Sequence, residues 1–305
     1  IANLWLEKDI PDGVPKGARD IALDEFEKKL NAMSLDALVD SNAVAEAISF
    51  RGYSPFEIVG QTERPDSLAA KLLEGKIDGS PVAITLPFLL VENFHTPEDY
   101  YLNYFFSSIA RTVRIIGFVI SILLPGLYVA ILSYHWEIIP TRMALSIAQA
   151  QEGLTIPTAI EAFMMLTIFE ILRETGIRTP TGLGQSMSIV GALVIGQAAI
   201  QARLTSPMMV IVVATTAMTA LLNYKLKGAT IFLRFMILLA GSVIGLYGIF
   251  VFCFLIIFHI SSIKSFGVQY TEKAFPMTKG IAKDSVIRAP GEGISRLDDK
   301  KKQKN

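Results

Sequence analysis

The sequence predicts a small cytoplasmic α/β domain, then an α-helical polytopic membrane domain, then a polar basic tail. Hydrophobic residues make up 51% of the 305 positions, and the mean hydropathy is +0.46, which is too apolar for an ordinary soluble domain. The formal net charge of zero hides an asymmetry: residues 1–112 carry 10 basic and 18 acidic side chains, whereas residues 259–305 carry 10 and 5. We place the domains at 1–110, 111–263 and 264–305. This charge pattern does not favour a nucleic-acid partner.

The front part has the pattern of a small α/β unit. Apolar residues at helical spacing predict helices over 23–33 and 34–48, and a third helix is expected over Arg64–Gly75, where Gly75 would end it. Phe56–Thr62 has strand character. The "DGS" within Ile77–Leu90 is a hairpin-turn signal followed by an apolar strand pattern.

Four uncharged apolar stretches predict four full membrane spans. Val113–Ser133 is long enough to cross about 30 Å of hydrocarbon, and Pro125 inside it predicts a kink. Gly184–Ile200 and Ser206–Leu222 have 17 residues each, at the short end for a span. Phe235–Phe258 has 24 uncharged residues, so we expect one continuous helix there.

The segment Thr141–Glu174 is less apolar and is expected to form a membrane-associated helical hairpin. Lysine and arginine favour the cytoplasmic side, so the basic tail should lie there, and the acidic front has no signal sequence. Two cytoplasmic ends require an even number of crossings, which favours four spans. The alternative is five spans, with the hairpin as a crossing. Five spans place Arg173 and Arg178 on the cytoplasmic side, but they place the basic tail on the outer side of the membrane.

Motifs of catalysis and metal binding are not found in the sequence. It has no HExxH, Walker, GxSxG or CxxC pattern, and its three histidines are scattered. The single cysteine, Cys253, lies in an apolar run and is expected to pack there. We therefore predict no enzyme activity, no catalytic residues, no cofactor and no metal site.

Two carboxylates, Glu161 and Glu170, interrupt an apolar helical segment and are candidate ion-path residues. At about 100° per residue, nine positions place them on opposite faces of one helix. A carboxylate held in hydrocarbon costs several kcal/mol and usually has a function. The alternative is an interfacial helix in which both carboxylates touch water and Glu170 pairs with Arg173.

Small residues form stripes on two of the predicted spans. Small side chains at every fourth position allow another helix to approach closely, and polar amides could face an ion in a pore. Packing of helices within the chain is the more common explanation of such stripes. The candidate pore-lining or pore-supporting residues are Ser188, Ala192, Gly196 and Gln197, and the candidate helix-packing residues are Gly241 and Gly245.

A series of motifs in order along the chain resembles one known family. The motifs include "QTERPD" (Gln61–Asp66), "LLPGLYVA" (Leu123–Ala130), "LSIAQAQEG" (Leu145–Gly153), "FEILRETGIR" (Phe169–Arg178) and "SIVGALVIGQAAIQA" (Ser188–Ala202). Together they are similar to the A subunits of the GerA-type spore germinant receptors. Paralogues of the stage V sporulation protein AF type share these motifs and are an alternative.

The resemblance implies a function and a location. It implies an integral protein of the bacterial spore inner membrane, with its N-terminal domain and C-terminal tail on the cytoplasmic side. The A subunit would form a homo-oligomer, a pentamer, whose pore in the lipid releases monovalent cations when a nutrient is sensed. Its partners would be a B subunit and a C lipoprotein. A non-conducting scaffold and an ion or amino-acid transporter are the alternative functions.

The sequence also departs from the family pattern. Family members carry another soluble subdomain ahead of this region, so we expect a fragment or a shortened protein. The segment before Asn223 lacks the Ile-Pro that the family places there, which leaves the break between the third and fourth spans without its usual residues.

Overall fold

The computed structural model describes residues 4–7, 54–56, 59–62, 73–77, 83–86, 88–100, 102–178, 184–265 and 268–271. The chain divides into two compact units. The first contains residues 1–113 and 257–305, and the second, called here the helical unit, contains residues 114–256. The N-terminal and C-terminal parts of the sequence thus belong to the same unit.

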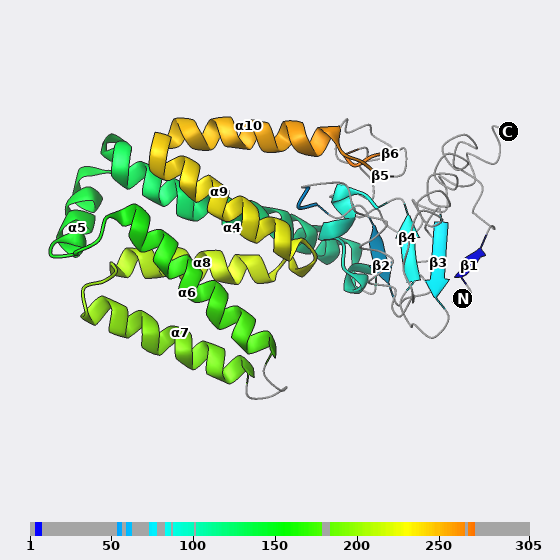
Figure 1. The fold of residues 1–305 in the computed structure, drawn as a ribbon, viewed down its shortest axis with the longest axis horizontal. Coiled ribbons are helices and arrows are strands. Elements are labelled where there is room, and N and C mark those ends of the chain that lie inside the picture. Colours follow the sequence, from blue (N-terminus) through cyan, green and yellow to red (C-terminus); the bar gives the residue numbers. More distant parts are fainter. Residues whose placement is uncertain are drawn as a thin grey trace, which may run out of the picture. The chain divides into compact units, whose positions relative to one another are not determined.

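The first unit contains an antiparallel sheet of four described strands, β1 (Leu4–Glu7), β2 (Gly60–Thr62), β3 (Leu73–Ile77) and β4 (Ala83–Leu86), in the order β1-β3-β4-β2 (Figure 1). The hairpin predicted around "DGS" is confirmed, since β3 pairs antiparallel with β4 and Lys76 lies opposite Ala83. The helix predicted to end at Gly75 is wrong in its last three residues, because Leu73–Gly75 belongs to β3. The helices predicted over 23–33 and 34–48 lie outside the described residues.

The segment that follows the last helix returns to the first unit. Strands β5 (Lys264–Ser265) and β6 (Val268–Gln269) pair with each other, and the same unit contains the 3-10 helices η1 (Leu90–Phe94) and η2 (Pro97–Tyr100). The Phe88 backbone N–H donates to the Ser265 hydroxyl at 3.1 Å, and the Asn93 amide donates to the Tyr270 hydroxyl at 3.0 Å. Hydrogen bonds between residues so distant in sequence fix the start of the basic tail onto this unit.

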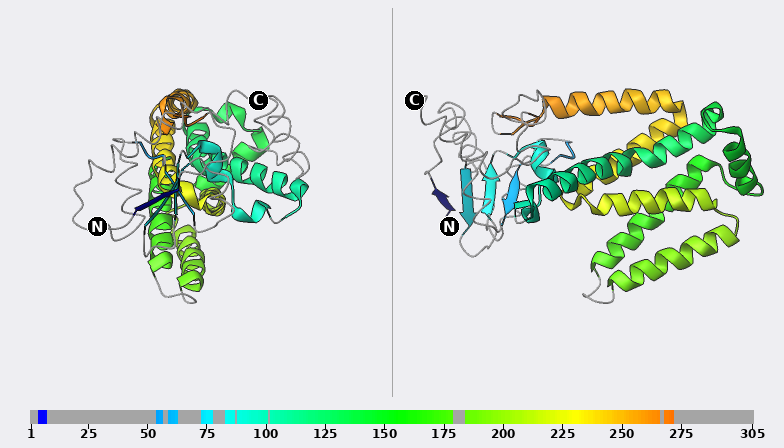
Figure 2. Two further views of the ribbon diagram at one scale, coloured as in Figure 1. Left: turned by 90° about the vertical axis from the view of Figure 1, so that its right-hand side faces the viewer. Right: turned by 180° about the vertical axis from the view of Figure 1, so that it is seen from behind.

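The remaining described elements are mostly helices. They are α4 (Tyr104–Tyr134), which begins in the first unit, then η3 (Trp136–Ile138), α5 (Thr141–Gln151), α6 (Thr158–Arg178), α7 (Gly184–Gln201), α8 (Pro207–Leu221), η4 (Tyr224–Leu226), α9 (Lys227–Ile244) and α10 (Leu246–Ser262). Helix α6 contacts α7, α8 and α9. The views in Figures 1 and 2 show α6 and α7 side by side. The predicted hairpin over 141–174 corresponds to α5 and α6.

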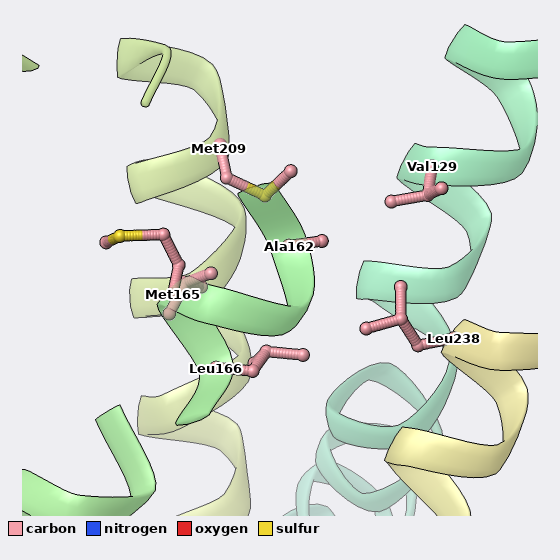
Figure 3. Close-up of a cluster of buried hydrophobic side chains, with 7 residues drawn as sticks. Val129, Ala162, Met165, Leu166, Met209 and Leu238 are labelled. Carbon is pink, nitrogen blue, oxygen red and sulfur yellow. The ribbon is translucent and has the colours of Figure 1, made fainter. Parts of the chain in front are cut away.

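A buried apolar cluster holds the helical unit together around α6. It combines Val129 of α4, Ala162, Met165 and Leu166 of α6, Met209 and Val213 of α8, and Leu238 of α9 (Figure 3). Four helices therefore contribute to one core, and α6 supplies the largest share of it. Closely packed interiors of this kind fix the positions of the polar groups beside them.

Two described helices are long and apolar enough to cross a membrane, Tyr104–Tyr134 and Tyr224–Ile244. Helices α8 and α10 are apolar but shorter. Large apolar side chains on them are strongly exposed, among them Met218 at 71% and Phe250 at 81%. Such apolar surface is unusual for a protein in water and suits contact with lipid or another protein.

The prediction of one continuous helix over 235–258 is wrong. Helix α9 ends at Ile244 and α10 begins at Leu246, with Gly245 between them at φ +71, a backbone angle that glycine adopts without strain. The Tyr134 hydroxyl lies 2.9 Å from the Ser242 carbonyl oxygen and can donate to it, which helps to satisfy the end of α9. Gly245 is thus a chain-reversal residue at the end of a helix.

Gly241, the other predicted packing glycine, lies within α9 against α4. A Cβ atom added to Gly241 would lie 2.8 Å from the Gly126 carbonyl oxygen, so the two backbones meet directly. The break between α8 and α9 is present without the Ile-Pro of the family pattern. Asn223 forms it with φ −127 and ψ 63, and its amide donates to the Arg114 carbonyl at 2.8 Å.

Candidate functional site

The first site in the helical unit lies where Glu161, in the first turn of α6, meets the start of α8. Its Oε1 atom accepts hydrogen bonds from the Thr205 hydroxyl at 2.7 Å, the Ser206 backbone N–H at 2.6 Å and the Ser206 hydroxyl at 3.0 Å. Glu161 is only 1% exposed. A carboxylate at a helix N-terminus is stabilised by the free N–H groups and by the helix dipole. Glu161 therefore connects α6 to the turn between α7 and α8.

The sequence around this turn explains its shape. Ser206 is the N-cap of α8, its hydroxyl accepts from the Met209 N–H at 3.2 Å, and Pro207 occupies the first helical position. Arg203 has φ +54, the left-handed conformation, which reverses the chain after α7. The turn also packs on the loop between α5 and α6, because a Cβ added to Gly153 would lie 2.7 Å from Arg203 Nη1.

The second carboxylate oxygen of Glu161 differs from the first. Among the described residues, the buried Glu161 Oε2 atom has no hydrogen-bond partner. The Tyr128 hydroxyl is buried too, and it interacts with the side chains of Ser206 and Glu161. The described part of the chain provides no cationic side chain in an ion pair with Glu161. One oxygen is therefore saturated with donors, and the other is buried without any.

The second site, farther along α6, is an ionic triad. Arg234 of α9 contacts Glu170 Oε1 through Nη1 at 2.7 Å, and Arg173 contacts Glu170 Oε2 through Nη2 at 2.8 Å. The Arg234 side chain is 0% exposed and that of Glu170 is 15% exposed. Formally the triad carries two positive charges and one negative charge. It joins α6 to α9 through charge-assisted hydrogen bonds.

Pro125 explains why an arginine is buried at this position. A proline within a helix has no N–H, so the carbonyl group four residues earlier loses its partner. In α4 that carbonyl belongs to Ser121, and the Arg234 Nε–H donates to it at 2.9 Å. Arg234 therefore satisfies a backbone acceptor freed by Pro125 and a carboxylate of α6 at once. It connects α4, α6 and α9.

The predicted ion-path carboxylates are thus placed separately, Glu161 against α8 and Glu170 against α9. The predicted pair between Glu170 and Arg173 is present. The alternative of an interfacial helix with both carboxylates in water does not describe Glu161, which is buried. The reason is that α6 packs on other helices on more than one side.

The structure locates only part of the predicted small-residue stripe of α7. Gly196 is buried, and a Cβ added to it would lie 3.7 Å from Val210 of α8, whereas Gln197 is exposed. The side chains of Ser188 and Ala192 lie outside the described residues. The described end of the stripe therefore packs within the chain.

Several polar residues of the two sites were not predicted as site residues. Arg234 carried a signal, because a lone arginine in an apolar helix is rare, but the predicted span began at the next residue. The Thr205-Ser206-Pro207 sequence is a helix-start signal, which does not reveal that Glu161 contacts it. Tyr128 has no such signal, since an aromatic residue in an apolar helix is ordinary.

The fold and these sites define a helical protein with ionisable side chains buried between apolar helices. The model of the Bacillus/Clostridium GerA spore germination protein family matches residues 16–298. The chain belongs to this family, which confirms the family predicted from the motifs.

Curated relatives agree with this assignment. The chain is 36% identical over 306 residues to spore germination protein KA of Bacillus subtilis (strain 168), a match that covers 94% of this chain and 56% of the relative. It is 37% identical over 272 residues to spore germination protein GerLA of Bacillus cereus, covering 87% and 55%. The chain thus spans about half the length of the curated relatives it matches. No solved structure matches it.

Proposed function

We propose that this protein is a subunit of a spore nutrient-germinant receptor and forms an oligomeric membrane channel that releases monovalent cations when a nutrient is sensed. Membership in the germination family supports the receptor role. The observation that carries the conducting role is the burial of Glu161 among apolar helices. Ionisable residues inside membrane segments usually mark ion or proton pathways. Glu161 would attract cations, whereas Glu170 is neutralised by Arg173 and Arg234, and the face of Ser188, Ala192, Gly196 and Gln197 would line or support the pore.

The proposed membrane arrangement has four crossings, with the N-terminal domain and the basic tail on the cytoplasmic side of the spore inner membrane. The lysine-rich tail and the positive-inside bias support this orientation. The break at Gly245 divides the last predicted span, 235–258, into α9 and α10, and Tyr224–Ile244 alone is long enough to cross the bilayer. Labelling of single cysteines placed in the tail, from either side of sealed vesicles, tests this orientation.

The proposed assembly is a pentamer in the lipid bilayer, joined by a B subunit that takes the nutrient and by a C lipoprotein. The exposed apolar faces of α8 and α10 offer surface for lipid or for neighbouring subunits. Cross-linking of the purified receptor, followed by mass measurement of the products, tests the subunit number and the partners.

Potassium release from spores tests the conducting role. The Gly196→Leu variant should block release after nutrient addition or abolish assembly, because the added side chain must fit beside Val210. Normal potassium release in this variant would show that the α7 face neither lines nor supports the pore. A Gly228→Leu variant is the matched control, since a Cβ at Gly228 would meet nothing within 4 Å.

A non-conducting scaffold is the second candidate, and one observation favours it. The buried Gly196 contacts α8 of the same chain, as expected when small residues serve packing alone. A cation-flux assay on purified protein in liposomes distinguishes the channel from the scaffold, because a scaffold gives no cation flux with any ligand. An ion or amino-acid transporter would instead give flux that depends on a solute gradient.

A further inference from the structure

We infer that Glu161 and Tyr128 bind a monovalent cation between α4, α6 and α8 in the helical unit. The inference deepens the proposed function and rests on it, because it assigns a binding site to the conducted ion. It depends on Glu161 Oε2, a buried oxygen atom with no hydrogen-bond partner among the described residues, and on the buried Tyr128 hydroxyl, which interacts with Ser206 and Glu161.

The hydrogen bonds of Glu161 indicate that its carboxylate is charged. Two hydroxyl groups and one backbone N–H all donate to Oε1, and the start of α8 adds the positive end of its dipole. Hydrogen-bond donors arranged in this way stabilise the charged carboxylate more than the neutral acid. The site is therefore built for a negative charge.

A buried negative charge needs a positive partner, and the described residues do not supply one at Glu161. The triad at Glu170 shows how this chain provides such a partner elsewhere, with arginines at 2.7 and 2.8 Å. The charge at Glu161 is then balanced by an ion from solution. The ion would contact Oε2, the oxygen without donors, and the Tyr128 hydroxyl oxygen.

The charge and the ligand types select the class of cation. One carboxylate neutralises one positive charge, whereas a divalent ion would leave the buried site with a net charge. Calcium sites commonly use several carboxylates, whereas the proposed site has one, and transition metals favour histidine and cysteine. Among the described residues, no group of three or more His, Cys, Asp or Glu side chains is placed to hold a metal ion. Potassium or sodium fits this site best.

Thermal unfolding of the full chain in detergent measures this binding directly. Potassium or sodium chloride, compared with N-methyl-D-glucamine chloride at equal ionic strength, should raise the melting temperature of the wild-type chain by about 3–6 °C. Glu161→Gln should lose this rise, since the amide can still accept hydrogen bonds but carries no charge. Tyr128→Phe should reduce it, because this variant lacks the hydroxyl oxygen that would contact the ion but keeps the aromatic ring.

Matched substitutions control for the change of side chain. Glu174→Gln, on the same helix but exposed, and Tyr224→Phe, also exposed, should both keep the full rise. An equal rise in Glu161→Gln and wild type, or no rise in wild type, would overturn the cation site. An infrared carbonyl band of a protonated acid, present in wild type with potassium and absent from Glu161→Gln, would overturn it too and assign a proton instead.

The thermal-unfolding test of the cation site does not depend on whether the protein conducts ions. If the cation-dependent rise is present but liposomes show no flux, the binding site stands and the channel proposal fails. If flux occurs and Glu161→Gln keeps the full rise, the channel proposal stands and the site fails.

Discussion

Glu161 and Glu170 lie nine residues apart on the same helix, yet their charges are stabilised in different ways. Glu170 lies between two arginines, one of which also binds a backbone carbonyl of α4. Glu161 receives three uncharged donors on one oxygen and none on the other. The comparison teaches that both carboxylate oxygens of Glu170 have a cationic partner within the chain, whereas one oxygen of Glu161 has no partner among the described residues. The first has the properties of a structural connection and the second those of a binding site.

The largest effect is expected at the Glu170 site. Arg234→Met leaves a buried carboxylate with one arginine and leaves the Ser121 carbonyl without a donor, so it should reduce stability by about 3–5 kcal/mol. Pro125→Ala restores an N–H four residues after Ser121. The double variant should therefore be less destabilised than the sum of the single changes. Thermal unfolding of all three variants measures this coupling, and strict additivity would show that Pro125 and Arg234 act independently.

The next effect concerns the donors at Glu161. Glu161→Ala leaves the Thr205 and Ser206 hydroxyls and one backbone N–H without their acceptor, which should cost about 2–3 kcal/mol. Glu161→Gln keeps an acceptor oxygen and should cost less. The melting temperatures of the two variants in N-methyl-D-glucamine chloride give the difference. Equal losses in melting temperature would mean that the charge of Glu161, and not its acceptor oxygen, stabilises the turn between α7 and α8.

A smaller effect is expected from Thr205→Val, which removes one of the three donors and keeps the side-chain shape. The expected loss is about 1 kcal/mol, the usual net value of one hydrogen bond. The rise in melting temperature with potassium should remain, because Oε2 is untouched. If that rise disappeared together with the Thr205 hydroxyl, the two oxygens of Glu161 would not have the separate roles that the comparison assigns to them.

The smallest effect is expected at an exposed ion pair farther along α6. Lys227 contacts Glu174 at 3.2 Å with side chains 38% and 48% exposed, so Lys227→Ala should change stability by about 0.5 kcal/mol or less. The measurement is the same thermal unfolding at low and high salt. A loss as large as that of Arg234→Met would contradict the view that burial decides the strength of the contacts on α6.

The sequence predicted much of the helical unit because apolar runs bounded by turn residues have strong local signals. It placed α7 and α8 nearly residue by residue. It did not predict the break at Gly245, because the run from 235 to 258 is uniformly apolar and a glycine is tolerated within such a helix. The break depends on contacts with Tyr134 of another helix.

The sequence by itself determined the family, the apolar character of the helices and the opposite faces of Glu161 and Glu170. These properties depend on composition, on ordered motifs and on the helical period, all of which are local. Only the tertiary structure decided which partners the two carboxylates have. Arg234 lies 64 residues from Glu170 and Ser206 lies 45 residues from Glu161, and packing of α4, α8 and α9 around α6 brings them together. Helix packing thus makes one carboxylate a structural connection and gives the other an oxygen free for a cation.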